Sequence, residues 1–306
     1  MMFQQRPPRH VRKIAGIRSR EVAGWRDIPL NALYFVEHTL PGGAGRDPRR
    51  GPALLLPGSW DPIQGEYSDN LIRSLLFETG APAVLEAHYR HGGQHGYVAP
   101  AALVEDLAAI YLDPDSPPTV VGLCFACPFV LEALLVARER CPAPPVAGVL
   151  VIGYGLPGFL NTVGRTALWS HINMKVGAEA RHCSYTGHTH VAGNNARGVA
   201  WTRGSRLLAA MEQAAKETSQ TPFPVTVDSL YFRLDISTRQ ARALTRQLFG
   251  IDGERDAIPG YHRSLRRRSP ADQMIAAFYE RTQTAAAASH SGAAATRARR
   301  TGRPDT

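Results

Sequence analysis

A cysteine stands between a short apolar strand pattern and a helical pattern. The β-branched residues 119–121 are followed at once by the motif Gly122-Leu123-Cys124-Phe125-Ala126 and then by apolar residues at helical spacing. This order predicts a strand, a sharp turn and a helix, with Cys124 at the turn. Backbone N–H groups at a helix N-terminus favour negative charge, so a thiol there can have a lowered pKa and act as a nucleophile. Gly122 and Ala126 are small, as a close approach of the backbone to itself requires.

Two other interpretations of Cys124 stay open. Free cysteine is among the residue types most often buried, so Cys124 can be an unreactive core residue. Cys124 and Cys127 also form a C-x-x-C pair, which can be half of a zinc site or a redox pair. The other half would come from His182, Cys183, His188 and His190. That stretch has the composition of a loop, and the chain has no second C-x-x-C, so we expect neither a metal nor another cofactor.

Composition indicates a soluble globular protein. The chain has 306 residues, of which 44% are hydrophobic and 20% charged, which suits one large domain with an insertion or two smaller domains. No apolar run reaches the roughly 18 residues needed to span a bilayer, and the basic N-terminus lacks the apolar segment of a signal peptide. The four cysteines are irregularly spaced. We therefore expect a reducing, cytoplasmic location without a disulfide framework.

The net charge of +9 is concentrated at the two ends of the chain. Residues 1–22 contain six basic side chains, and residues 285–306 contain four. Residues 1–22 also lack apolar periodicity, and residues 285–306 have low complexity. We interpret the first segment as a flexible basic arm and the last as a disordered tail. We expect neither a nucleic-acid partner nor a membrane partner.

Strand and helix patterns alternate over most of the chain. An antiparallel hairpin is predicted first, with strands near residues 22–25 and 33–37. Further strands are predicted at residues 53–56, 83–87, 119–121, 146–152, 224–231 and 256–258. Helices are predicted at residues 67–78, 101–111, 239–249 and 270–282. This order predicts the α/β class, with a mostly parallel sheet and helices on both faces.

The alternation is interrupted between residues 156 and 222. This segment mixes helical stretches near residues 159–176 and 203–217 with the histidine-rich loop. We interpret it as a cap insertion that covers the strand ends. The expected organisation is therefore a core made of residues 23–155 and 223–284, with the cap between its two parts.

The order of these landmarks resembles that of the α/β-hydrolase family over roughly residues 25–284. Residues 121–126 resemble the nucleophile elbow of that family. The other matching segments are residues 54–58, where Pro57 replaces the histidine of a His-Gly pair, residues 90–93, residues 230–235, and residues 258–262 followed by Ser269 and Pro270. The resemblance implies the α/β-hydrolase fold with an inserted cap.

The resemblance also implies a catalytic triad of Cys124, Asp235 and His262, in the family's order of nucleophile, acid and histidine. His262 would take the thiol proton and later protonate the leaving group, while Asp235 would orient the imidazole. Asp235 is expected where a strand ends, whereas Asp228 is expected inside that strand. The other candidates for the acid are Asp228, Asp252 and Asp256.

An oxyanion hole follows from the same resemblance. It would consist of the backbone N–H groups of Ser59 and Phe125, which would point at the developing negative charge. Trp60 and Trp169 are candidates for the substrate pocket, and each can equally be a packing residue. No metal ligand is implied.

The cysteine at position 124 resembles dienelactone hydrolases and polyhydroxyalkanoate synthases, which have cysteine in place of serine at the nucleophile elbow. A thiolate attacks thioesters and activated esters readily, and the acyl group can pass from it to water or to another nucleophile. The expected function is a cysteine-dependent hydrolase of an ester, a lactone or an acyl thioester, with a small-molecule or carrier-bound acyl substrate. The alternatives are an acyltransferase or cyclase with the same triad, and a non-catalytic binding protein with this fold. The sequence does not indicate the oligomeric state.

Overall fold

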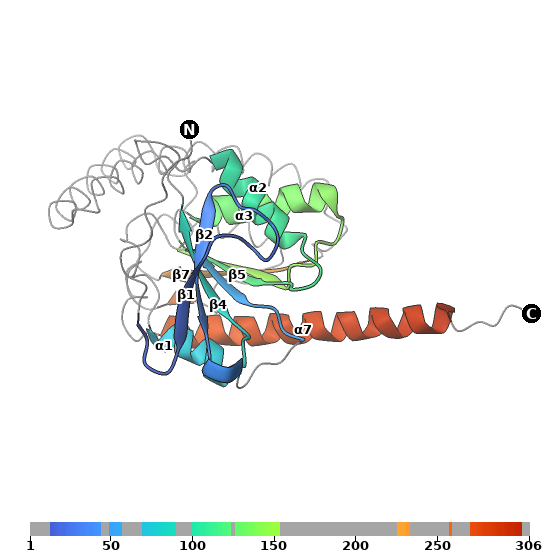
Figure 1. Cartoon of the computed structure of the whole chain (residues 1–306). Helices are drawn as coiled ribbons and strands as arrows, with labels where there is room; N and C mark the ends of the chain where they lie inside the picture. Colours follow the sequence, from blue (N-terminus) through green and yellow to red (C-terminus); the bar gives the residue numbers. More distant parts are fainter. Residues whose placement is uncertain are drawn as a thin grey trace, which may run out of the picture.

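The computed structural model describes residues 13–43, 49–56, 69–89, 100–123, 126–153, 225–232, 257–258 and 270–301 (Figure 1). Within these residues, eight strands form one sheet in the order β1-β2-β4-β3-β5-β6-β7-β8. The strands are β1 (Arg18–Val22), β2 (Leu33–Thr39), β3 (Ala53–Leu56), β4 (Val84–Tyr89), β5 (Thr119–Leu123), β6 (Gly148–Ile152), β7 (Thr226–Phe232) and β8 (Ala257–Ile258). The helices are α1 (Asp69–Arg73), which continues as the π-helical η2 (Ser74–Glu78), α2 (Pro100–Tyr111), α3 (Ala126–Arg140) and α7 (Pro270–Thr301), with a short helical turn η1 (Pro41–Gly43) after β2.

The sheet is antiparallel at one end and parallel across the rest. β1 pairs antiparallel with β2, and β2 pairs antiparallel with β4. From β4 through β3, β5, β6 and β7 to β8, every pairing is parallel. Strands β3, β5 and β6 are buried along their whole length, as expected for apolar strands covered on both faces. The predicted α/β class with a mostly parallel sheet is confirmed.

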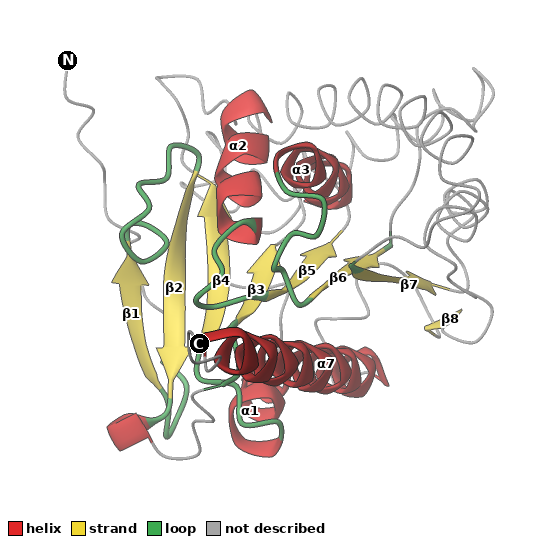
Figure 2. Cartoon of the chain, turned by 90° about the vertical axis from the view of Figure 1, so that its right-hand side faces the viewer, coloured by secondary structure: helices red, strands yellow, loops and turns green. Residues whose placement is uncertain are grey.

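Helices cover both faces of this sheet. α2 and α3 lie on one face, and α1 and α7 lie on the other (Figure 2). Leu54 and Leu56 of β3 pack in the apolar cluster under α2 and α3, whereas Ala53 and Leu55 pack in the cluster under α1 and α7. This division follows the two-residue period of side chains along a strand. One strand therefore contributes to two separate parts of the core.

The N-terminal hairpin is shifted from its predicted place. The partner of β2 is β1, at residues 18–22, and not a strand at residues 22–25. Trp25 lies beyond β1, where its indole N–H donates a hydrogen bond of 2.7 Å to Oδ2 of Asp113. The interpretation of residues 1–22 as a flexible arm is therefore wrong for residues 18–22. The exposed Arg18 and Arg20 give this segment a charged composition that is typical of disordered chain. Charged side chains are also common on edge strands, because they discourage pairing with other chains.

The C-terminal segment is helical beyond its predicted end. α7 continues from Pro270 to Thr301, and Figure 1 shows its second half extending past the sheet. The predicted helix end at Thr282 and the predicted disorder of residues 285–301 are therefore wrong. Their low complexity comes largely from alanine, which has the highest helix propensity of all residues.

The beginnings of the parallel strands are tied to α7. The N–H of Gly51, before β3, donates to Oε1 of Gln283 at 2.7 Å, and the hydroxyl of Tyr279 donates to the Gly51 carbonyl at 2.6 Å. Nε2 of Gln283 donates to the Pro117 carbonyl at 2.9 Å and to the Thr119 hydroxyl at 3.1 Å. We call these five residues the amino-edge cluster. A Cβ at Gly51 would lie 1.9 Å from the Pro117 oxygen, so only glycine fits there.

Four predicted parts of the chain lie outside the described residues. They are residues 1–12 of the arm, the cap at residues 156–222, the helix at residues 239–249 and residues 302–306 of the tail. Among the residues that the structure does describe, no helix combines the length and the apolar character needed to cross a bilayer.

Candidate active site

The carboxyl ends of the parallel strands lie along one edge of the sheet. Leu56 of β3 pairs with Gly122 of β5. Leu123 of β5 pairs with Ile152 of β6, which in turn pairs with Leu230 of β7. The strands therefore reach nearly the same level before the chain leaves the sheet. Ligands of open α/β sheets bind outside these ends, so this edge is the candidate active site.

The turn between β5 and α3 is very short. Cys124 and Phe125 are the two residues between the strand and Ala126, where the helix begins, and both lie outside the described residues. Just before the turn, a Cβ at Gly122 would lie 2.9 Å from Cγ2 of Val130 in α3. Ala126 is completely buried. The predicted strand and the predicted helix are confirmed on either side of these two residues, and the close contact explains why Gly122 must be small.

Cys127, the second cysteine of the C-x-x-C pair, occupies a structural position. Its side chain is completely buried. Its Sγ lies 3.3 Å from the Gly122 carbonyl and 3.5 Å from the Ile152 carbonyl, to which the thiol donates. The thiol thus ties the first turn of α3 to the ends of β5 and β6, and a thiol that donates is protonated, unlike a metal-bound thiolate. Groups of three or more metal-ligating side chains are absent from the described residues, which include neither Cys124 nor the histidine-rich stretch.

The other predicted site residues follow described strand ends but lie outside the described residues themselves. Ser59 and Trp60 come three and four residues after β3, Asp235 comes three residues after β7, and His262 comes four residues after β8. Trp169 belongs to the predicted cap, which is also not described. The structure therefore brings together the strand ends that precede these residues, and the meeting of their side chains stays a prediction.

Asp228 lies inside β7, as predicted. Its Oδ2 accepts a hydrogen bond of 2.8 Å from Nη2 of Arg281 in α7, and its Oδ1 accepts one of 2.8 Å from the N–H of Ser229. Its partner across the sheet is Leu150, two positions before the last pair of β6 and β7. Because this carboxylate is engaged by α7 away from the carboxyl edge, the structure argues against Asp228 as the acid, and the role of Asp235 stays a prediction. The remaining candidates, Asp252 and Asp256, lie outside the described residues.

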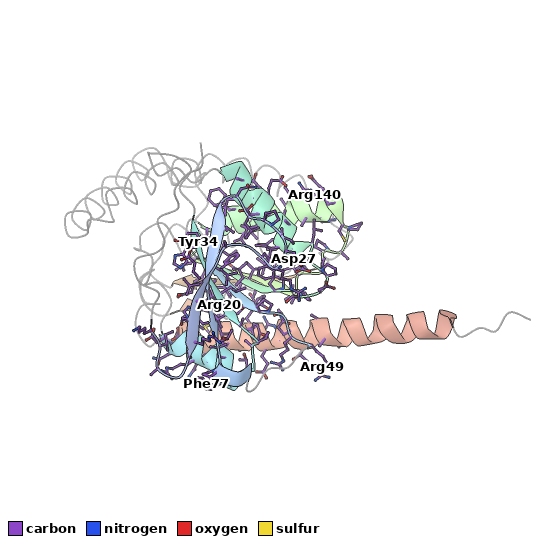
Figure 3. The ribbon with its side chains drawn as sticks, viewed as in Figure 1. Arg20, Asp27, Tyr34, Arg49, Phe77 and Arg140 are labelled. Carbon is purple, nitrogen blue, oxygen red and sulfur yellow. The ribbon has the colours of Figure 1, made fainter. Side chains whose placement is uncertain are left out.

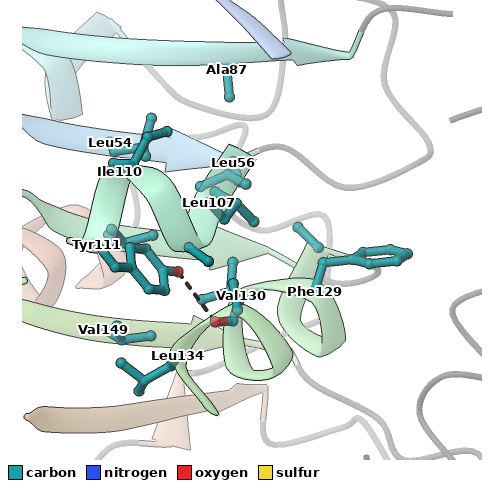
Figure 4. Packing of buried hydrophobic residues seen from close by; sticks show 14 of the residues in the cluster. Leu54, Leu56, Ala87, Leu107, Ile110, Tyr111, Phe129, Val130, Leu134 and Val149 are labelled. Carbon is teal, nitrogen blue, oxygen red and sulfur yellow. Dashed lines mark hydrogen bonds between the residues drawn. The ribbon is translucent and has the colours of Figure 1, made fainter. Parts of the chain in front are cut away.

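Tyr111 holds α3 against α2. Its ring is completely buried, and its hydroxyl donates a hydrogen bond of 3.2 Å to the Val130 carbonyl (Figure 4). Burial raises the pKa of Tyr111 well above its usual value, because a phenolate there would lose its hydration. The side chain is therefore a neutral donor. Since Val130 also packs on Gly122, this contact supports the position of α3 beside the turn.

Sequence analysis missed a row of polar side chains at the antiparallel end of the sheet. His38 is completely buried on β2, with its Nδ1 2.8 Å from Oγ of Ser19 on β1 and its Nε2 3.0 Å from Oε2 of Glu86 on β4. We call these three residues the buried polar row. A signal was present, because His38 and Glu86 interrupt apolar strand patterns. The pairing of β2 with both β1 and β4, which brings the three together, has no local signature.

Comparison with known proteins identifies the fold. No protein-family model matches the sequence, and no curated protein matches it. A thermostable esterase from Pseudomonas putida is 12% identical, with a TM-score of 0.53 over 90% of this chain and 83% of that one. A hyperthermophilic esterase from the archaeon Pyrobaculum calidifontis is 15% identical, with a TM-score of 0.52 over 88% and 84%. A haloalkane dehalogenase variant from Bradyrhizobium elkanii is 12% identical, with a TM-score of 0.52 over 90% and 100%.

The chain has the α/β-hydrolase fold. The resemblance that the sequence motifs indicated is therefore confirmed for the fold. At these identities the likeness extends to the fold alone. The cysteine between β5 and α3 is a feature of this sequence, and its chemistry has to be argued from its position.

Proposed function

We propose that the protein is an α/β-hydrolase enzyme that uses Cys124 to cleave an ester, a lactone or an acyl thioester. The observation that carries this proposal is that only two residues, Cys124 and Phe125, separate the end of β5 from the start of α3. In such a turn the side chain that follows the strand projects from the sheet edge, beside the N–H groups of a helix N-terminus. Esterases with the same fold support the choice of acyl chemistry.

The first half of the proposed reaction forms an acyl-enzyme. His262 accepts the thiol proton of Cys124, and the thiolate attacks the acyl carbonyl carbon. The N–H groups of Ser59 and Phe125 donate to the oxygen that becomes negative, and removal of one such donor typically costs about 3 kcal/mol of barrier lowering. When the tetrahedral intermediate collapses, the alcohol or thiol leaves with the proton from His262, and the acyl group stays on sulfur.

The second half releases the acyl group. His262 removes a proton from water, the water oxygen attacks the thioester carbonyl, and the carboxylic acid leaves as the thiol is reprotonated. Asp235 would accept the second imidazole N–H throughout and so hold the ring in the productive tautomer. Trp60 and Trp169 would line the acyl pocket.

Thiol chemistry narrows the substrate class. A thiolate attacks a thioester or an activated ester readily, whereas amides are much less reactive towards this nucleophile. The acyl-enzyme is itself a thioester, so an alcohol or an amine can replace water as the acceptor. A small-molecule or carrier-bound acyl thioester therefore fits the proposal best.

The experiment combines alkylation by iodoacetamide with turnover of a p-nitrophenyl acyl ester. It uses the wild-type protein, Cys124→Ala and Cys141→Ala. Cys141 is the matched control, because it is a half-buried thiol just after α3, where it donates to the Ala143 carbonyl. We expect Cys124 to be alkylated first, turnover to fall in step with that alkylation, and Cys141→Ala to be as active as wild type.

Two results separate the proposal from its alternatives. Full turnover by Cys124→Ala, or faster alkylation of Cys141 with no loss of turnover, would refute the proposed nucleophile. Product analysis with an added alcohol or amine then distinguishes hydrolysis, which yields the free acid, from acyl transfer, which yields a new ester or amide.

A further inference from the structure

The buried polar row joins three neighbouring strands on one face of the sheet. Ser19 and His38 are direct partners in the pairing of β1 with β2. In the pairing of β2 with β4, His38 is opposite Val84, and Glu86 is the diagonal neighbour two residues further on. Side chains in these positions lie within reach of each other. Residues that are far apart in sequence therefore form one continuous hydrogen-bonded row.

The donor at each hydrogen bond follows from the chemistry of its two groups. When Glu86 is an ionised carboxylate and His38 a neutral imidazole, Nε2 of His38 carries the proton and donates to Glu86 Oε2 at 3.0 Å. Nδ1 of that tautomer is an acceptor, and the Ser19 hydroxyl at 2.8 Å is its donor. A hydroxyl, an imidazole and a carboxylate in this order are the elements of an activated serine nucleophile.

Ser19 has the access that the other two residues lack. His38 and Glu86 are buried, whereas Ser19 is half-buried. Among the described strands, β1 is the edge strand beside β2 and pairs with β2 alone. Its neighbours in sequence, Arg18 and Arg20, are exposed, and Figure 3 labels Arg20 on this outer strand. A small electrophile can therefore approach Ser19 from the sheet edge, where the nearby charged side chains are Arg18, Glu21 and Arg20, which is paired with Glu37.

We propose that Ser19 is a base-activated hydroxyl and a covalent modification site for phosphonyl and activated acyl electrophiles, separate from the site around Cys124. With a fluorophosphonate, the Ser19 Oγ–P bond forms, the P–F bond breaks and fluoride leaves. The Ser19 proton passes to Nδ1 of His38 and then to solvent, while Glu86 stabilises the imidazolium. The product is a stable serine phosphonate, so the expected readout is one adduct per protein molecule.

The same chain offers a matched control serine. Ser74 in η2 is also half-buried, and its Oγ donates to Oε2 of Glu78 at 2.6 Å. This hydroxyl has a carboxylate acceptor but no imidazole. A carboxylate is a weaker base than imidazole by about 2 pKa units in their ordinary states, so Ser74 measures the reactivity of a hydrogen-bonded serine without the histidine.

The test is the rate of fluorophosphonate labelling at Ser19 and Ser74 in the full chain. Digestion with a glutamyl endopeptidase yields peptide 1–21, in which Ser19 is the only hydroxyl side chain, and peptide 67–78 with Ser74. Trypsin is unsuitable because Arg18 and Arg20 flank the serine. We expect labelling of Ser19 at least about 10-fold faster than that of Ser74, which is a modest effect for a positioned base.

Variants then connect the reactivity to the row. His38→Gln should lower the Ser19 rate to that of Ser74, Glu86→Gln should lower it partly, and Cys124→Ala should leave it unchanged. Equal rates at Ser19 and Ser74 in the wild-type protein, absence of a Ser19 adduct, or an unchanged rate in folded His38→Gln would each overturn the proposal. The wild-type ratio needs no variant, so it decides the question even if His38→Gln does not fold.

Discussion

The two edges of the parallel sheet are built in different ways. At the amino edge, Gly51 and Thr119 are hydrogen-bonded to Tyr279 and Gln283 of α7 at distances between 2.6 and 3.1 Å. At the carboxyl edge, the strands end at similar levels and continue into the segments that hold the predicted site residues. The difference indicates that the contacts that stabilise the fold and the proposed catalytic residues lie at opposite ends of the strands. Changes at the amino edge should therefore affect stability, and changes at the carboxyl edge should affect turnover.

The largest expected effect comes from replacing, one at a time, two aspartates at β7. Asp228 lies inside this strand, and Asp235 follows its end. Asp235→Asn should lower kcat by about 10³- to 10⁴-fold, as expected when the carboxylate that orients a catalytic histidine is lost. Asp228→Asn should leave turnover within about 2-fold of wild type. Its partner Arg281 is 60% exposed, so the lost ion pair should cost at most about 1 kcal/mol of stability.

Turnover of an acyl ester and urea unfolding of both variants measure this contrast. A large loss of kcat in Asp228→Asn with full activity in Asp235→Asn would show that the acid is Asp228 and that the assignment to Asp235 is wrong. It would also show that chemistry is not confined to the carboxyl edge.

The second contrast concerns the amino edge. Gly51→Ala would force a methyl group against the Pro117 carbonyl oxygen, 1.9 Å from an ideal Cβ, and should lower the free energy of unfolding by about 3 kcal/mol. Tyr279→Phe removes only the hydroxyl that donates to Gly51 and should cost about 1 kcal/mol. Turnover per folded molecule should be unchanged in both variants. Urea unfolding together with active-site titration checks this. Normal stability with reduced turnover would show that the amino edge serves the chemistry and not the stability of the fold.

The parallel strands and the junction between β5 and α3 were readable from local sequence. Apolar runs such as the one in β5 predict strands that are buried on both faces. Gly122 and Ala126 at a boundary between strand and helix then predict a tight turn, and the close contact of Gly122 with Val130 gives the physical reason. The α/β class and the approximate place of most of the described elements follow from such local patterns.

Two elements were misread because composition and structure diverge at the ends of the chain. β1 is rich in charge because it is an edge strand, where one side meets solvent. The second half of α7 has low complexity because it is rich in alanine, and alanine also favours a helix. Neither segment has the apolar periodicity that would have identified it.

The contacts between distant residues were not readable at all. The ion pair of Asp228 with Arg281 and the row of Ser19, His38 and Glu86 depend on which strands and helices become neighbours. Local patterns do not encode that order. The meeting of Cys124 with Asp235 and His262 rests on family resemblance and on the positions of the strand ends, and it stays a prediction.

The most direct measurement of the central claim is the intact mass of the protein after incubation with a panel of acyl thioesters of different chain length. The account predicts a mass increase equal to one acyl group, located on Cys124 by fragmentation, released by hydroxylamine and absent from Cys124→Ala. The absence of any adduct across the panel while the ester is still turned over, or an acyl group on another residue in a fully active enzyme, would contradict the account.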